Sequence, residues 1–172
     1  MPFALVVCGV SGCGKTSLGR ALSTALSLPF QDADDFHSVA NREKMSSGVP
    51  LTDADREPWL NLCAEWLLSI AAHGGILACS ALRKRYRDVL TKAAPALVFV
   101  YIATTSEGDE TVLAARLKNR PSHFFSASLL SSQLATVEPP TSDERAILIP
   151  ISSSIADAVD ATIATLNDAY RC

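Results

Sequence analysis

The sequence predicts an α/β fold, a three-layer α/β/α sandwich built on a five-stranded parallel sheet. Three observations predict it. Five short predicted strands alternate with helical patterns, as in sheets whose parallel strands are joined by helices. A glycine-rich turn joins the first apolar run to an amphipathic helix. The chain has 172 residues, of which 48% are hydrophobic, so residues 1–172 are expected to form a single domain.

The first half of the chain is expected to hold two strands and three helices. The first four elements are a strand at 3–8, a helix at 16–28, a strand at 30–32 and a helix at 39–45. A long helix follows, and Thr52 or Asp53 can cap it because both side chains accept amide hydrogens. Pro58 falls in its first turns, where a missing amide hydrogen costs little. Its apolar side chains recur at helical spacing and predict core packing, namely Trp59, Leu62, Cys63, Trp66, Leu67 and Ile70.

The second half continues the same alternation after Gly74 and Gly75, which end the long helix. Strands are expected at 76–80, 97–102 and 147–151, and helices at 83–93, 110–119 and 125–136. Ser153 or Ser154 can cap a C-terminal helix. The apolar side chains expected to face inward from that helix are Ile155, Val159, Ile163 and Leu166.

The turn after the first strand carries a phosphate-binding motif. Residues 9–16 read Gly-Val-Ser-Gly-Cys-Gly-Lys-Thr, the G-x-x-x-x-G-K-T pattern of a P-loop, in the strand-loop-helix context that this motif requires. Its glycines let amide hydrogens approach phosphate oxygens, and the following helix N-terminus favours an anion. Lys15 should reach the β- and γ-phosphates of ATP, and the Thr16 hydroxyl should hold Mg²⁺. The sequence therefore predicts ATP and Mg²⁺ as cofactors.

The plan of a small kinase is predicted by three features together: this motif, the five strands, and the insertions after strands two and four. The fold is expected to be of the P-loop nucleoside-monophosphate-kinase type, with a lid at about 107–136. Arg116 and Arg120 lie in that lid, four residues apart on one helix face, where cations can cover the phosphates during transfer. The alternative is a basic, solvated helix end. The residues expected to bind ATP are Gly9, Val10, Ser11, Gly12, Cys13, Gly14, Lys15, Thr16, Ser17, Arg116 and Arg120.

A cluster of carboxylates follows the second strand, at the edge where ligands bind in open α/β sheets. If the extended conformation continues, Asp32 and Asp34 point to the same face. One could support Mg²⁺ through water and the other could accept or orient a substrate hydroxyl; the alternative is a solvated acidic turn that caps a helix. Arg56 could clamp a carboxylate or phosphate, or it could pair with a nearby surface aspartate. His37 and His123 could contact substrate, or be ordinary loop histidines.

Composition restricts the partners and the compartment. The net charge is −3 and no basic block occurs, so no nucleic-acid partner is expected. No apolar run approaches the roughly 20 residues that span a bilayer, and the first strand lacks the basic flank of a signal peptide, so a cytoplasmic protein without a membrane partner is expected. Cys8 and Cys79 are expected to be reduced core residues. Cys13 lies beside a helix N-terminus, where a thiol pKa falls, so it is either oxidation-sensitive or simply a small loop residue.

Several sequence blocks beyond the P-loop resemble the gluconokinase family. The first is Asp-Ala-Asp-Asp-Phe-His at 32–37. The others lie, in the family's order, at 41–45, 48–60, 78–84, 86–90, 123–124, 129–130, 132–134 and 138–140. The chain departs from the common pattern at Cys13, where serine is usual, and at Arg83, where lysine is usual. Together the blocks are highly specific and run from the first strand to about residue 140.

The resemblance implies ATP-dependent phosphorylation of D-gluconate at its 6-hydroxyl, which gives 6-phosphogluconate and ADP and feeds the pentose phosphate pathway. It also implies a relation to shikimate kinase, and a possible homodimer. By that analogy Lys15, Asp34 and Arg120 are the catalytic residues, and Thr16 and Asp32 serve the metal. The residues implied to bind substrate are Asp34, His37, Arg56, Ser80, Arg83, His123 and Gln133.

Two other functions remain as alternatives. The first is another small-molecule kinase, such as a shikimate or nucleoside monophosphate kinase, although the blocks at 53–60 and 78–84 argue against both. The second is a nucleotide-dependent switch or binding module. The chain lacks the Asn-Lys-x-Asp motif with which GTPase switches read guanine, and it keeps both the lid arginines and the Asp-x-Asp motif.

Overall fold

Five parallel strands form one sheet in the order β2-β3-β1-β4-β5. The structure is a computed structural model that describes residues 3–104, 109–118 and 128–169. The strands are β1 (Ala4–Cys8), β2 (Phe30–Asp32), β3 (Gly75–Ala78), β4 (Val98–Ala103) and β5 (Ala146–Pro150). Each lies within a few residues of its expected position, so the five-stranded parallel sheet is confirmed.

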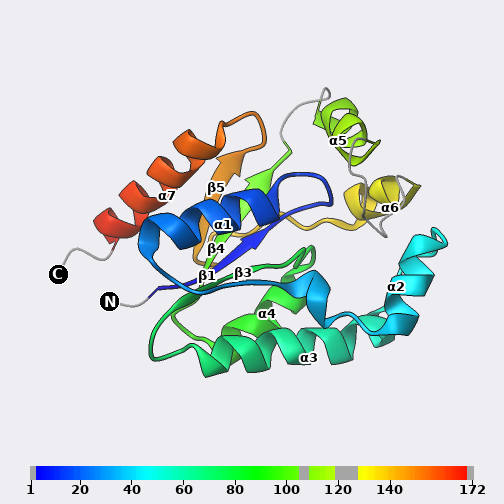
Figure 1. The fold of residues 1–172 in the computed structure, drawn as a ribbon, viewed down its shortest axis with the longest axis horizontal. Coiled ribbons are helices and arrows are strands. Elements are labelled where there is room, and N and C mark those ends of the chain that lie inside the picture. The colour runs from blue at the N-terminus through cyan, green and yellow to red at the C-terminus, as the bar shows by residue number, and fades with distance from the viewer. Residues whose placement is uncertain (1–2, 105–108, 119–127, 170–172) are drawn as a thin grey trace.

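Helices cover both faces of this sheet. They are α1 (Lys15–Leu26), α2 (Val39–Ser46), α3 (Asp53–Ser69), α4 (Lys84–Ala93), α5 (Asp109–Lys118), α6 (Ser128–Thr136) and α7 (Ile155–Ala169), with a 3-10 helix, η1 (Ala33–Phe36). Figure 1 shows α1 and α7 on one face and α3 and α4 on the other, which confirms the three-layer arrangement. The helices α2, α5 and α6 gather beyond the carboxyl ends of the strands, where the P-loop also lies (Figure 1).

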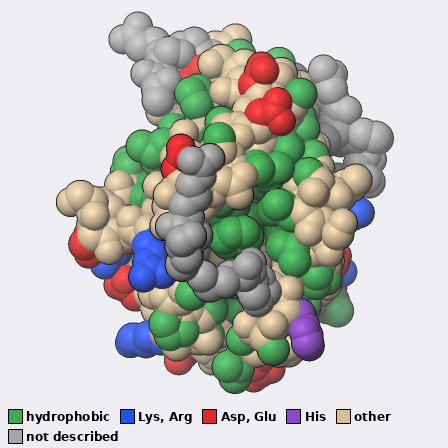
Figure 2. Space-filling view, turned by 90° about the vertical axis from the view of Figure 1, so that its left-hand side faces the viewer, with side chains coloured by type: hydrophobic (Ala, Val, Ile, Leu, Met, Phe, Trp, Pro, Cys, Tyr) green, Lys and Arg blue, Asp and Glu red, His purple; other side chains and the backbone are tan. Residues whose placement is uncertain are grey.

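The opposite end of the molecule is formed by the amino ends of the strands. Figure 2 views this end, where lysine and arginine side chains are dispersed among apolar and acidic ones rather than gathered into one patch. None of the helices within the described ranges is long and apolar enough to cross a membrane.

The alternation of side chains along β1 divides the core into two layers. Leu5 and Val7 pack in the cluster toward α1 and α7, whereas Val6 and Cys8 pack in the cluster toward α3 and α4. The central strands are buried on both faces, which is why they read as continuous apolar runs. Cys8 and Cys79 are 0% and 1% exposed, as expected of core thiols.

Two side chains that were expected to face inward are exposed. Leu62 is 43% exposed because α3 turns a different stripe, which includes Trp59 and Cys63, toward the sheet. Ile155 is 42% exposed because it lies in the first turn of α7, beside the open end of the sheet. Periodicity identified both helices, but the direction from which each helix meets the sheet decided which apolar residues are buried.

A buried ion pair holds α4 to the loop that precedes β5. The Arg87 side chain is 0% exposed and donates to both carboxylate oxygens of Glu144, at 2.5 and 2.9 Å. It also donates to the carbonyl oxygens of Ala81 at 3.1 Å and Glu138 at 2.9 Å. Burial is the largest single influence and would raise the pKa of Glu144, but the hydrogen bonds from Arg87 and Thr141 and the charge of Arg87 together lower that pKa. Arg87 therefore joins β3, α4 and β5 near the carboxyl edge of the sheet.

Replacing Glu144 with alanine should destabilise the fold by about 3–5 kcal/mol, because it leaves the Arg87 guanidinium buried without its counter-charge. The free energy of unfolding, measured by urea denaturation, checks this value. Glu65→Ala removes an exposed glutamate from α3 and serves as the control, with a change expected within about 0.5 kcal/mol. A loss at Glu144 no larger than that of the control would mean that the pair contributes no stability.

Candidate active site

The P-loop has the backbone conformation that its glycines predict. Gly9 has a φ of +139°, and a β-carbon there would lie 2.9 Å from the carbonyl oxygen of Ile102 in β4. Gly14 has a φ of +106° and directly precedes α1. No acidic side chain lies in the first turn of α1, so the positive end of the helix is left for an anion. The loop can therefore cradle phosphate groups.

The two residues expected to serve the metal lie together. The Thr16 hydroxyl donates a 2.7 Å hydrogen bond to Oδ2 of Asp32, at the end of β2. A hydroxyl and a carboxylate are hard oxygen donors of the kind Mg²⁺ prefers, and Mg²⁺ usually takes few protein ligands because phosphates and waters complete its shell. Within the described ranges no group of three or more His, Cys, Asp or Glu residues could hold a metal. The pair therefore fits a magnesium ion that reaches the site with a nucleotide.

Asp34 is not on a strand, which corrects the expectation that it shares a strand face with Asp32. The chain leaves β2 at Asp32 and enters η1, where the Asp34 amide donates a 3.1 Å hydrogen bond to Oδ1 of Asp32. The Asp32 carboxylate thus caps η1 as well as accepting from Thr16. Both carboxylates still line one cavity. The acidic cluster therefore combines the capping role and the site that were considered as alternatives.

One cavity runs from the P-loop to α2 and α6. It contains most of the expected substrate and metal residues, which come from five separate segments of the chain. Its lining residues are Ser11, Gly12, Gly14, Lys15, Thr16, Asp32, Asp34, His37, Met45, Pro50, Leu51, Arg56, Trp59, Ser80, Leu129, Ser132, Gln133 and Thr136. Lys15 lies at the P-loop side, and its Nζ donates to the Val10 carbonyl oxygen at 3.0 Å. The cavity therefore joins the phosphate loop to a pocket for a second substrate.

Arg56 lines this cavity from the first turns of α3. Its guanidinium donates to the carbonyl oxygen of Leu51 and lies 5.8 Å from the ring centroid of Tyr86. Among the described residues no carboxylate forms an ion pair with Arg56, so the surface pairing considered as an alternative is not found there. Arg83 differs, since it lies outside the residues that line the cavity and its Nη1 is 3.7 Å from Asp53. The structure thus brings Arg56, but not Arg83, into the pocket.

His37 lines the same cavity and is buried, with 9% of its surface exposed. Its ring stacks on Trp59, with 4.7 Å between centroids and 9° between planes. Its Nδ1 is buried and has no hydrogen-bond partner among the described residues. Burial lowers the pKa of His37 from 6.5 to about 4, helped by the charges of Arg42 and Arg56 and opposed by that of Asp32. His37 is therefore neutral at physiological pH.

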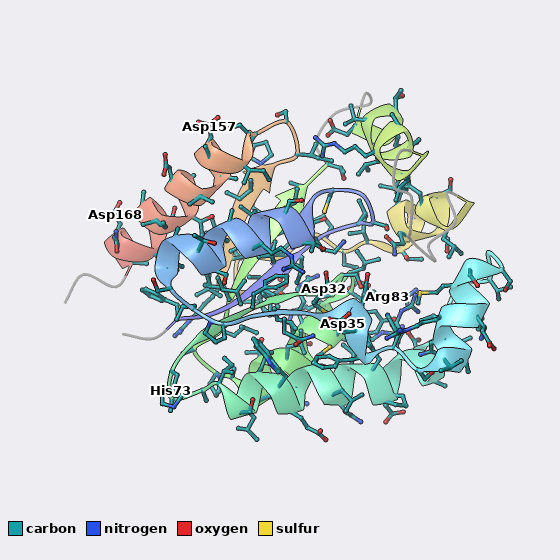
Figure 3. The ribbon with its side chains drawn as sticks, in the orientation of Figure 1. Asp32, Asp35, His73, Arg83, Asp157 and Asp168 are labelled. Carbon is teal, nitrogen blue, oxygen red and sulfur yellow. The ribbon has the colours of Figure 1, made fainter. Side chains whose placement is uncertain are left out.

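The depressed pKa of His37 predicts a loss of stability in acid. Between pH 6.5 and about 4 the unfolded chain binds a proton that the folded protein does not, so stability falls as the pH drops through this window. His37→Phe keeps the stack on Trp59 and should remove at most about 3 kcal/mol of this dependence. Urea unfolding at about pH 7 and about pH 4.5 checks the difference. His73→Phe, at an exposed turn far from the cavity (Figure 3), is the control and should keep the wild-type pH dependence of stability. The same pH dependence in wild type, His37→Phe and His73→Phe would contradict a lowered pKa of His37.

A second cavity adjoins the other side of the P-loop. It is lined by Gly12, Cys13, Gly14, Ser17, Leu18, Ile102, Arg116, Ile149, Pro150, Ile151, Ser153, Ser154, Ile155 and Ala158. Its lining mixes apolar and polar side chains, and its position beside the P-loop and α1 could accommodate a nucleotide base. Arg116 on α5 lies over the P-loop, with Nη1 3.4 Å from the Cys13 carbonyl oxygen. Burial raises the pKa of the Cys13 thiol, which favours the small-residue role over an oxidation-sensitive one.

Of the other expected site residues, the structure describes Gln133 and Ser80 but not Arg120 and His123. Gln133 on α6 accepts a 2.7 Å hydrogen bond from the Ser11 amide, so it joins the lid side of the first cavity to the P-loop. Ser80 follows β3 and lines that cavity, and its carbonyl oxygen accepts from the Gly9 amide at 3.3 Å. Arg120 and His123 lie outside the described residues, and α5 ends at Lys118. Their roles stay predictions.

Sequence reasoning missed several cavity residues. Trp59 was expected only in the core, yet it is 3% exposed, lines the cavity and donates to the Ala33 carbonyl oxygen at 2.7 Å. Ser132 and Thr136 stand near Gln133 on α6 and share its side of the cavity. Their spacing of four residues was the available signal, because residues i and i+4 lie on one helix face.

Comparisons with known proteins agree with this geometry. The family described as shikimate kinase matches residues 11–147. A gluconokinase of Gluconobacter oxydans (strain 621H) is 51% identical over 150 residues, which cover 86% of this chain and 82% of the relative. The thermoresistant gluconokinase of Escherichia coli (strain K12) is 36% identical over 162 residues, which cover 90% of both chains.

Solved structures give the same result. The crystal structure of a gluconokinase from Sinorhizobium meliloti 1021 is 40% identical, covers 98% of this chain and 93% of its own, and has a TM-score of 0.85. A shikimate kinase from Aquifex aeolicus is 14% identical with a TM-score of 0.58, a likeness of fold alone. Together the matched residues, the P-loop and the sheet order show that this chain belongs to the gluconokinase family, a branch of the shikimate-kinase-like P-loop kinases.

Proposed function

We propose that this protein transfers the γ-phosphoryl group of ATP to the 6-hydroxyl of D-gluconate, giving 6-phospho-D-gluconate and ADP. One observation supports D-gluconate as the acceptor. The guanidinium of Arg56 faces the cavity that also holds Lys15 and Asp34, and it has no ion-pair partner among the described carboxylates. Gluconate supplies a carboxylate for Arg56 and a chain of hydroxyls that can extend toward the P-loop.

The proposed mechanism is direct in-line transfer. The P-loop amides and Lys15 hold the β- and γ-phosphates, and Asp34 positions the 6-hydroxyl against the γ-phosphate. Thr16 and Asp32 would hold the Mg²⁺ that accompanies ATP, and the ion would neutralise charge on the phosphates. Arg116, together with Arg120, closes over the transferring group and excludes water. The base of ATP occupies the second cavity, between α1 and the start of α7.

His37 and Gln133 complete the proposed acceptor site. Neutral His37 lines the acceptor side of the cavity, and its ring is held in place by the stack on Trp59. Gln133 already contacts the P-loop amide of Ser11, so an acceptor bound beside α6 is brought close to the phosphates. Ser80 supplies a further hydroxyl on the strand side of the cavity.

A coupled ADP-release assay tests this proposal. The panel is Mg-ATP with D-gluconate, shikimate, glycerate, AMP or CMP. Turnover with gluconate alone is the expected result. Turnover only with another acceptor would mean that the matched sequence blocks preserve the fold while the specificity differs, and would overturn the proposal.

A further inference from the structure

Tyr86 contacts Arg56 on one side and charged side chains outside the cavity on the other. It lies in the first turn of α4 and is 6% exposed. The ζ-carbon of Arg56 is 5.8 Å from its ring centroid, and that of Arg85 is 5.3 Å away. Both distances fall within the roughly 6 Å over which a guanidinium is attracted to an aromatic ring. The ring is therefore a neutral surface against which the guanidinium of Arg56 rests.

The Tyr86 hydroxyl is engaged at the start of α3. It donates to Oδ1 of Asp53, while Arg85 donates to Oδ2 of the same carboxylate at 2.5 Å. Nη1 of Arg83 lies 3.7 Å from Oδ1. Both oxygens of Asp53 are thus occupied by residues of the segment that begins α4.

Asp53 would otherwise be a natural partner for Arg56. The two residues are three apart at the start of α3, a spacing at which acidic and basic side chains on a helix can pair. In this structure Arg56 instead rests on the Tyr86 ring and donates to the Leu51 carbonyl oxygen. Among the described residues no other acceptor binds the Arg56 guanidinium, so its remaining N–H groups can serve a ligand in the cavity, and the side chain is already held in place before that ligand arrives.

We propose that Tyr86 is a positioning residue that keeps Asp53 from pairing with Arg56 and holds the Arg56 guanidinium ready for the carboxylate of the acceptor. This inference rests on the proposed function and extends it, because it assigns affinity for the acid group to a residue that does not line the cavity. Without the Tyr86 hydroxyl, Oδ1 of Asp53 keeps only the longer 3.7 Å contact with Arg83 and competes with the substrate carboxylate for Arg56. Tyr86 thus tunes acceptor affinity and leaves phosphoryl transfer itself unchanged.

Steady-state kinetics of Tyr86→Phe test the proposal. This variant keeps the ring and loses the hydrogen bond to Asp53, so KM for D-gluconate should rise by about threefold to tenfold, the scale of one hydrogen bond. The values of kcat and of KM for ATP should stay within about twofold. Repeating the substitution in an Arg56→Met background should leave KM for gluconate nearly unchanged, because the group that Tyr86 positions is then absent.

Tyr101→Phe provides the matched control, since it removes the hydroxyl of another buried tyrosine, in β4 and 4% exposed. An unchanged gluconate KM in Tyr86→Phe would overturn the inference. A similar rise in the gluconate KM in the wild-type and Arg56→Met backgrounds would also overturn it, as would an equal change in the KM for ATP. A merely structural role of Tyr86 would produce either result. A wild-type protein that does not phosphorylate gluconate would instead overturn the proposed function, and this inference with it.

Discussion

Replacing Lys15 with alanine is expected to lower kcat by about 10³-fold or more, the scale on which a cation acts on a transferring phosphoryl group. Lys15 is the first residue of α1, directly after the left-handed Gly14, so its ammonium lies at the phosphate end of the cavity. In the structure it makes a 3.0 Å hydrogen bond to the Val10 carbonyl oxygen across the loop. Losing that bond should cost only about 1 kcal/mol of stability.

The measurement is kcat under saturating Mg-ATP and gluconate, together with the melting temperature. Lys92→Ala, which removes an exposed lysine from the last turn of α4, is the charge-matched control and should keep wild-type turnover. Lys15→Arg should not restore activity, because a planar guanidinium cannot replace a compact ammonium inside the loop. Wild-type turnover in Lys15→Ala, with the fold retained, would remove Lys15 from the mechanism.

Replacing Asp34 with alanine is expected to abolish most phosphoryl transfer while ATP binding is kept. A positioned group that accepts or orients the reacting hydroxyl contributes about 10²- to 10⁴-fold, so kcat should fall within that range. The substitution should not disturb the turn, because the contact that anchors η1 runs from the Asp34 amide to the side chain of Asp32. The Thr16–Asp32 pair that fits the metal also remains.

Asp35→Ala gives a close control for this experiment. Asp35 is the neighbouring carboxylate in η1, but it is exposed, lies outside the cavity lining and accepts a 3.0 Å hydrogen bond from Gln31. Calorimetric titration with ATP should give similar affinities for wild type, Asp34→Ala and Asp35→Ala, and only Asp34→Ala should lose turnover. Unchanged gluconate kinetics in Asp34→Ala would exclude Asp34 from the reaction.

Local patterns predicted the elements of this fold well. The P-loop was readable because its glycines, lysine and threonine act within eight consecutive residues, where chain spacing is spatial proximity. The central strands β1, β3 and β4 were readable because burial on both faces requires continuous apolar runs. Thr52 was recognised as a helix cap for the same reason, and it forms a capping box with Asp55.

The errors arose where the direction of packing or a competing local bond decided the outcome. Leu62 and Ile155 have the spacing of core residues, but the faces that their helices turn to the sheet leave them exposed. Asp34 lies outside the strand because its amide donates to the carboxylate of Asp32, two residues earlier, and this bond caps η1. The spacing of residues along the sequence does not by itself distinguish a buried from an exposed apolar side chain, or a strand residue from one in a helical turn.

The sequence by itself thus determined the fold class, the phosphate loop and, through the matched blocks, the family. Only the tertiary structure decided which distant side chains meet: Gln133 with the P-loop, His37 on Trp59, Arg87 with Glu144, and Tyr86 between Arg56 and Asp53. The physical reason is that motifs and helix caps are local interactions, written in neighbouring residues. The charge, protonation and availability of a side chain instead depend on groups that the folded chain brings together across tens of residues.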